Sequence, residues 1–167
     1  MALLRKITKA KWYDTPWLQN GEVPADALVD LRTQNNELSV WRIEPDRANL
    51  NAVIAALASN KTDRLANLDY VLLDEEVVIA LGIQSVKSDG DSPHRHANSH
   101  WHWDLVHLTA AKVLGLAREM KRREAEHKRV QHTAVREILR AALQGGELDR
   151  DVVKPDLLDQ LEGRSST

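Results

Sequence analysis

The sequence contains no cysteine among its 167 residues, which excludes disulfide bonds, thiolate metal ligands and cysteine nucleophiles together. This composition fits a reducing compartment. No apolar run approaches the length that spans a bilayer, and the first residues, Met-Ala-Leu-Leu-Arg-Lys, lack the apolar segment of a secretory signal. We therefore expect a soluble, cytoplasmic protein.

Phenylalanine is also absent, and seven glycines leave little room for a phosphate-binding loop. The sequence has neither a Gly-x-Ser-x-Gly elbow nor another recognisable nucleophile motif. Hydrophobic residues nevertheless make up 43% of the chain and charged residues 29%, which is typical of a folded domain with a buried core. These features favour a folded protein that is not an enzyme.

The first hundred residues mix strand and helix patterns. Weak alternation predicts a short strand at 7–12, and β-rich runs at 27–32 and 38–44, separated by polar turn residues, predict a hairpin. Apolar residues at helical spacing predict a helix over 46–59 with Asp46 as its N-cap. Acidic residues followed by apolar ones predict a short helix at 74–81 ended by Gly82, and alternation predicts a strand at 83–87.

From residue 101 the apolar spacing becomes helical, is interrupted by a polar stretch at 121–129, and resumes at 130–143 before Gly145 and Gly146. The sequence therefore predicts an α+β fold with a small antiparallel sheet, or alternatively a mixed one, and packed helices. We divide it into an α+β part at 1–100, a long helical segment at 101–145, either continuous or broken near 121–129, and a short terminal helix and tail at 146–167.

The polar stretch at 121–129 leads to a functional prediction. A helix that is polar all round cannot be buried, so it would bridge solvent between two packed ends. The apolar stripe after it would then lie roughly 20–30 Å beyond the first one. We expect a protein partner or a second copy of the chain to cover this stripe, which makes the protein an interaction or assembly module. The stripe consists of Val130, Ala134, Ile138, Leu139 and Leu143.

Five of the seven histidines fall between residues 94 and 107. A helix capped at 98 or 99 would place His100, Asp104 and His107 on one face, with His94 or His96 folding back from the preceding loop. Imidazole and carboxylate ligands in this arrangement suit Zn²⁺ or Fe²⁺. A metal-binding protein or metal-dependent enzyme using His96, His100, Asp104 and His107 is therefore an alternative, set against a polar loop whose histidines only cap and hydrogen-bond.

The segment 112–140 carries nine lysines and arginines against four glutamates. Such a stripe can contact phosphates, so nucleic-acid binding through Arg122, Arg123, Lys128 and Arg129 is a second alternative. Glutamates four residues before cations neutralise part of this charge, no aromatic residues interleave with the cations, and the sequence pI is about 6.4. These features favour the interaction module.

Overall fold

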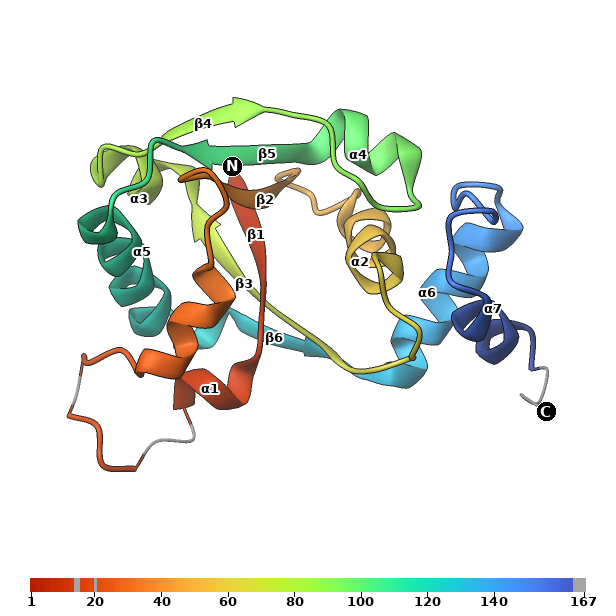
Figure 1. The fold of residues 1–167 in the computed structure, drawn as a ribbon, viewed down its shortest axis with the longest axis horizontal. Coiled ribbons are helices and arrows are strands. Elements are labelled where there is room, and N and C mark those ends of the chain that lie inside the picture. Colours follow the sequence, from red (N-terminus) through yellow and green to blue (C-terminus); the bar gives the residue numbers. More distant parts are fainter. Residues whose placement is uncertain (14–15, 20, 164–167) are drawn as a thin grey trace. The chain divides into compact units, whose positions relative to one another are not determined.

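A computed structural model describes residues 1–13, 16–19 and 21–163; the end of the predicted tail, 164–167, lies outside the described residues. The described part combines one six-stranded sheet with helices, which confirms the α+β class (Figure 1). The strands are β1 (Ala2–Ile7), β2 (Leu38–Ile43), β3 (Leu68–Asp74), β4 (Gln84–Lys87), β5 (His102–Val106) and β6 (His127–Val130), in the spatial order β4-β5-β2-β1-β3-β6.

The helices are α1 (Lys9–Tyr13), η1 (Ala25–Leu31), α2 (Leu50–Ser59), α3 (Glu75–Ala80), α4 (Arg95–Trp101), α5 (Ala110–Arg122), η2 (Glu124–Glu126), α6 (His132–Gln144) and α7 (Pro155–Glu162), of which η1 and η2 are 3₁₀ helices. Within the described ranges, no helix is both long and apolar enough to cross a membrane.

The chain forms two compact units, each assembled from three separate segments. Unit 1 contains Met1–Arg42, Asp69–Lys87 and Trp103–Lys128, and unit 2 contains Ile43–Leu68, Ser88–His102 and Arg129–Thr167. This division interleaves along the sequence, whereas the expected parts were consecutive ranges.

Unit 1 holds most of the sheet and a core between one sheet face and its helices. The strands β1 and β3 pair antiparallel, with Leu3 opposite Leu73, and β4 and β5 pair antiparallel as well. Successive strand residues point to opposite faces, so Leu38 and Val40 of β2 enter the same core. On α5, Leu116, Ala117 and Met120 recur at helical spacing and are buried there.

Asp30, in η1, joins the helices of unit 1 to the sheet. Its Oδ2 atom accepts hydrogen bonds from the backbone N–H of Thr8 at 2.6 Å and from Nε1 of the fully buried Trp12 at 2.9 Å. Its backbone carbonyl accepts from Nε of Arg5 at 3.0 Å. One carboxylate thus satisfies a buried indole and fixes where the chain turns from β1 into α1.

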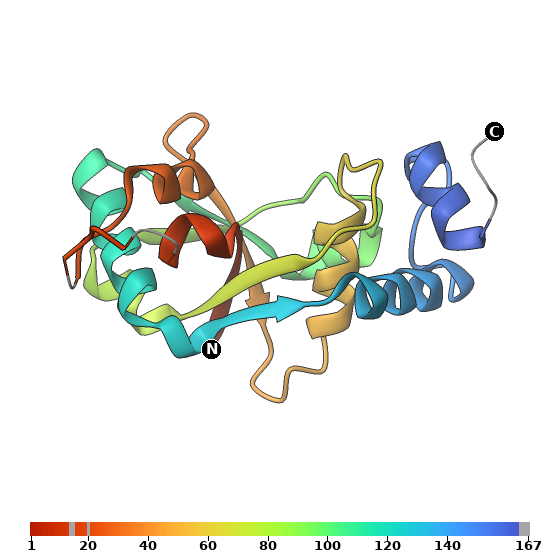
Figure 2. The same ribbon diagram turned by 90° about the horizontal axis from the view of Figure 1, so that it is seen from below.

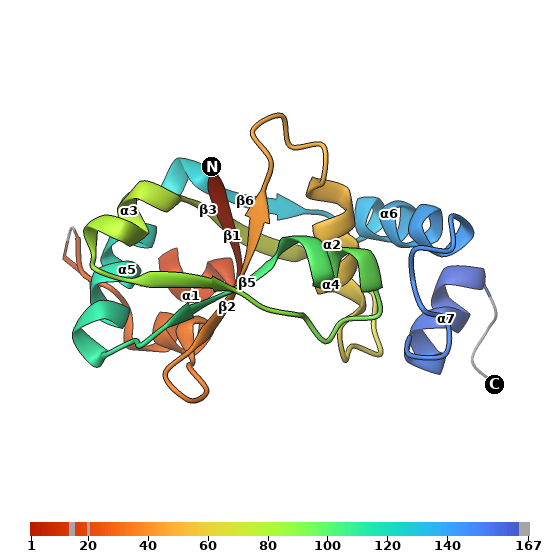
Figure 3. The ribbon, with the colours of Figure 1, turned by 90° about the horizontal axis from the view of Figure 1, so that it is seen from above.

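Unit 2 is helical around α2. Helix α2 packs against α4 and α6, and α7 packs against α6. Figure 2 shows α6 beside α2, and Figure 3 shows α4 beside α2. On α6, Val135, Leu139 and Ala142 follow the i, i+4, i+7 spacing of one helical face and are buried.

The structure corrects the long helical segment expected at 101–145. Residues 102–106 form β5 and residues 127–130 form β6, so the helices α5 and α6, separated by η2 and β6, take its place. The polar stretch that was expected to bridge solvent is the end of α5, the turn η2 and an edge strand. The polar stretch therefore does not bridge solvent within one continuous helix, and Leu139, one member of the stripe that follows it, is buried in unit 2.

Smaller corrections concern the first sixty residues. Residues 27–31 belong to the 3₁₀ helix η1, so the hairpin expected from 27–44 does not form, although β2 itself is confirmed. The strand expected at 7–12 is displaced to β1, and α1 follows it. Helix α2 begins at Leu50, because Asp46 accepts a hydrogen bond from the N–H of Ala48 in a turn instead of capping the helix. Helices α3 and α6 and strand β4 are confirmed.

Candidate functional site

The loop before α4 is held by a buried polar network in unit 2. The Oδ1 atom of Asn98 accepts a hydrogen bond from Oγ of Ser92 at 2.6 Å, and Nδ2 of Asn98 donates to the Ser92 carbonyl at 2.7 Å. A Cβ added to Gly90 would lie 2.8 Å from Asn98 Oδ1, so this glycine lets the loop pass directly over the amide. The network therefore fixes the entry into α4 and the histidines that the helix carries.

His94 is the N-cap of α4 and is 1% exposed. Its Nδ1 atom accepts a hydrogen bond from the N–H of Ala97 at 3.3 Å, which places the proton of the neutral ring on Nε2, 3.4 Å from a carboxylate oxygen of Glu147. Burial lowers the pKa of His94, and the charge of Glu147 offsets part of that effect. In this tautomer Nδ1 accepts a hydrogen bond and Nε2 carries the proton, so His94 presents no free lone pair to a metal or a substrate.

His96 and His100 lie one turn apart on the exposed side of α4. Their ring centroids are 3.9 Å apart, and the ring planes differ by 32°. The backbone carbonyl of His96 lies 3.0 Å from Nδ1 of His100. The ring of the half-buried Trp101 stands edge-on to His96, with centroids 4.9 Å apart.

The other two members of the predicted metal set do not share this helix. Asp104 lies on β5, where one of its carboxylate oxygens is 3.1 Å from Oγ of Ser39, and His107 is an exposed residue after that strand with a φ of +53°. The shared helical face of His100, Asp104 and His107 is therefore wrong, because β5 interrupts the helix. Among the residues that the structure describes, no group of three histidines or carboxylates could hold a metal ion.

A second buried histidine, His127, lies in unit 1. Its Nε2 atom is 3.0 Å from the Met120 carbonyl, and its ring meets those of Trp12 and Tyr13 edge-on. Burial lowers its pKa, and the hydrogen bond to the Met120 carbonyl offsets part of that effect.

The predicted phosphate-binding cations make contacts within the chain. Arg122 pairs with Glu119 at 2.6 Å, Arg123 pairs with Asp74 at 2.7 Å, and Nζ of Lys128 donates to the Ala125 carbonyl at 2.5 Å. The fourth cation, Arg129, is exposed on β6. Unit 1, which includes the first three of these cations, carries 13 lysines and arginines and 13 aspartates and glutamates, so its formal net charge is zero.

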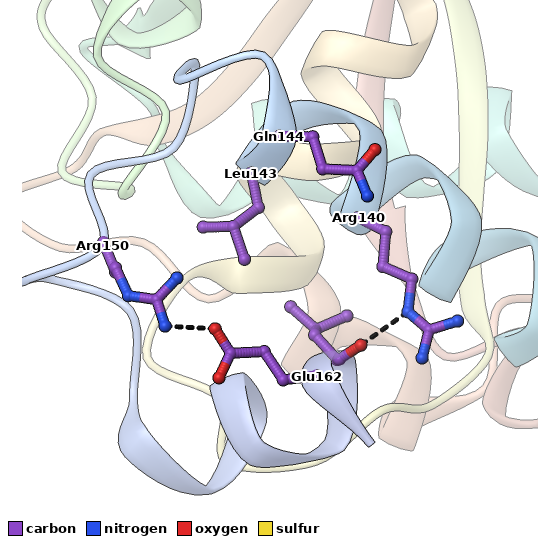
Figure 4. Close-up of a pocket in the computed structure, with 6 residues that line it drawn as sticks. Arg140, Leu143, Gln144, Arg150 and Glu162 are labelled. Atoms are coloured by element: carbon purple, nitrogen blue, oxygen red, sulfur yellow. Dashed lines mark hydrogen bonds and ion pairs between the residues drawn. The ribbon is translucent and has the colours of Figure 1, made fainter. Parts of the chain in front are cut away.

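A cavity of about 480 Å³ opens between α6 and α7 in unit 2. We call it the α6–α7 pocket; its lining residues are Arg140, Leu143, Gln144, Arg150, Leu161 and Glu162. Figure 4 shows Leu143 pointing into the space that two arginines and Glu162 surround. Nε of Arg140 donates to the Leu161 carbonyl at 2.5 Å, and the guanidinium of Arg150 pairs with the carboxylate of Glu162.

The predicted interaction residues divide into two groups in this structure. Leu139 is fully buried, whereas Val130, Ala134, Ile138 and Leu143 are half-buried. Leu143 is the member of this stripe that lines the pocket. Sequence reasoning missed Arg150 and Glu162 as its companions, since they reach the pocket only through the packing of α7 on α6.

The composition of the pocket suits one kind of ligand. Its two arginines offer planar donors that bind carboxylates well, and its two leucines offer apolar contact.

The chain matches no family model, and no curated protein or solved structure is significantly similar to it.

Proposed function

We propose that this chain is a non-enzymatic protein-interaction module whose α6–α7 pocket binds an acidic and apolar segment of a partner protein. One observation carries the proposal: two arginines and two leucines line the same cavity. The proposal keeps the interaction through the C-terminal helices that the sequence favours. It replaces the uncovered stripe with a defined pocket.

The apolar contribution comes from Leu143 and Leu161. Leu161 is 2% exposed and forms part of the packed wall, whereas Leu143 is half-buried and points into the open space. A partner's apolar side chain that covers Leu143 removes its remaining surface from water, which is favourable by about 25 cal/mol per Å² of apolar area.

The charge of the pocket selects an acidic partner. Arg150 already pairs with the carboxylate of Glu162 in the same unit, which means that a carboxylate can reach its guanidinium. Arg140 uses Nε for the Leu161 carbonyl, and its remaining nitrogens are available for a second carboxylate. A cavity of about 480 Å³ is the size of a site for a few side chains, which indicates a short segment instead of a whole domain face.

The test uses a short fluorescent peptide of alternating leucine and glutamate, with a peptide of leucine and lysine as its counterpart, and fluorescence anisotropy on the full chain. The acidic peptide is expected to bind and the basic one not. Arg140→Gln and Arg150→Gln should each weaken binding about tenfold or more, because each removes a charge-assisted hydrogen bond. Arg118→Gln, which changes an exposed arginine of α5, is the matched control.

The carboxylate of Glu162 provides a second, independent readout. It competes with a ligand for Arg150, so Glu162→Gln is expected to strengthen binding of the acidic peptide. The α6–α7 pocket would be refuted as the binding site if both peptides bound equally well. It would also be refuted if neither arginine substitution changed the affinity for the acidic peptide. Association of the chain with itself that Arg150→Gln abolishes would identify a second copy as the occupant and would overturn the proposal of a separate partner protein.

The two alternatives from the sequence stay predictions. Nucleic-acid binding through Arg122, Arg123, Lys128 and Arg129 predicts an affinity that falls steeply with salt. A Zn²⁺- or Fe²⁺-dependent activity predicts metal in the purified protein and loss of that metal in His100→Ala.

A further inference from the structure

We propose that His96 and His100 form a surface site for a first-row divalent metal ion, of which Cu²⁺ is bound most tightly. The site belongs to unit 2 and is independent of the α6–α7 pocket. It retains two of the four residues suggested by the sequence and rests on their geometry in α4.

The spacing of the two rings fits a shared ion. Residues four apart on a helix are neighbours on its surface, and these two ring centroids are 3.9 Å apart. An ion sits about 2.0–2.1 Å from one nitrogen of each imidazole and close to the plane of each ring, so the two rings, which face one another at a tilt of 32°, must turn to share it. Both side chains are exposed, so they turn about their side-chain bonds without opening the core.

Two oxygen atoms beside Nδ1 of His100 favour one tautomer of its ring. Nδ1 lies 3.0 Å from the His96 carbonyl, which only accepts, and 2.9 Å from Oγ of Ser99, which can also accept, so both contacts fit a neutral ring with its proton on Nδ1. Nε2 therefore has the free lone pair. Metal-binding histidines characteristically donate their other ring N–H to a backbone carbonyl or carboxylate, which fixes the ring and raises its basicity. His100 makes this contact in the chain as it stands.

The ligand type determines the class of metal. Two imidazoles without a thiolate suit Cu²⁺, Ni²⁺ and Zn²⁺, and a given nitrogen site binds Cu²⁺ most tightly among them. His94 is not a third ligand, because its Nδ1 atom accepts from Ala97 and its Nε2 proton faces Glu147. Water completes the coordination on the open side, where His96 also lines a cavity of about 520 Å³.

Trp101 makes binding visible. Its ring stands 4.9 Å from that of His96, so Cu²⁺ held by the two histidines lies close enough to quench its fluorescence. The experiment titrates Cu²⁺ into the full chain, prepared without a histidine tag, and follows both heat release and tryptophan emission. We expect one site per chain that quenches a fraction of the emission.

His96→Ala and His100→Ala are each expected to weaken Cu²⁺ binding more than about tenfold, since even the loss of a partner to a metal-bound histidine costs 10–100-fold. His107→Ala and His132→Ala, two exposed histidines elsewhere in the chain, should leave the affinity unchanged. Trp101→Phe should keep the heat of binding and lose the metal-dependent quenching. Cu²⁺ binding that survives in the double variant His96→Ala/His100→Ala with undiminished affinity overturns the proposal.

Discussion

Truncation of Leu139 tests whether α6 is covered by its own unit. Leu139 lies on the face of α6 that carries Val135 and Ala142, and it has no exposed surface. Leu139→Ala removes three buried carbon groups, which contribute about 0.8 kcal/mol each, or about 2.4 kcal/mol together. The cavity left behind raises the expected loss in the free energy of unfolding to about 3–4 kcal/mol.

Leu143→Ala is the matched control, because it makes the same chemical change one turn further along α6 at a half-buried position. Its expected cost is about 1 kcal/mol, since part of the side chain already faces the open pocket and less packing is lost. Urea unfolding of both variants and of the unchanged chain, each at several protein concentrations, measures the difference. For a chain of this size, the loss at Leu139 corresponds to a fall in Tm of about 10 °C.

Two results would refute the reasoning. Equal, small losses for the two leucine variants would mean that Leu139 is not packed as the structure shows. A stability of the unchanged chain that rises with protein concentration would mean that a second copy supplies part of the cover, as a stripe without an internal partner requires.

Three further predictions concern single positions. Gly90→Ala should lower the free energy of unfolding by about 1–3 kcal/mol, because the added Cβ disturbs the buried hydrogen bonds of Asn98. Gly115→Ala is the comparison: its Cβ meets only the end of a flexible leucine side chain at 3.1 Å, so the free energy of unfolding should stay unchanged or rise by up to about 1 kcal/mol. Asp30→Ala should cost about 1–3 kcal/mol in the same urea experiment by leaving the buried Trp12 indole without its acceptor, and a loss under 0.5 kcal/mol, the usual scatter of surface changes, would contradict that role. The pKa of His94 is lowered in the folded chain, so the unfolded chain binds a proton there first, and the free energy of unfolding should fall as the pH drops below about 6.5. His94→Asn keeps an N-cap acceptor and should make the free energy of unfolding depend less on pH in this range. An unchanged pH dependence would show that His94 is not responsible.

Regular amphipathic helices were predictable from the sequence, and some strands were not. Helices α3 and α6 follow from apolar spacing and a glycine at the end, because these signals act within the helix itself. Strand β6 has no such signal: it is a sheet edge, where charged residues such as Lys128 and Arg129 are tolerated and discourage pairing with another chain. Its strand character comes from pairing with β3.

Strand β5 was missed for a different reason. Leu105 and Leu108 stand three residues apart and imitate a helical repeat with the apolar residues of α5, although both are buried in the unit 1 core. The opposite error occurred at η1, where residues typical of β-strands predicted a strand, although the buried residues, Ala27 and Leu31, have the spacing of a helix. Neighbouring strands and helices decided both segments, and a single sequence does not show them.

The candidate site was predictable only in fragments. Leu143 follows from spacing along one helix, because residues three or four apart share a face, whereas His96 was expected in the loop before the helix and lies instead on α4 with His100. Arg150 and Glu162 reach the pocket because the chain turns after α6 and brings α7 back against it. His100 is separated from Asp104 and His107, its expected partners on a shared helical face, because β5 lies between them. The spacing of residues along the sequence does not predict contacts that depend on where the chain turns.

The interleaved segments of the two units have a consequence for synthesis. The last piece of unit 1 ends at Lys128, and unit 2 waits for α6 and α7 beyond it. Neither unit has all its parts until synthesis has passed residue 128, so we expect the emerging polypeptide to leave the leucines of β1 uncovered, and accessible to chaperones, until then.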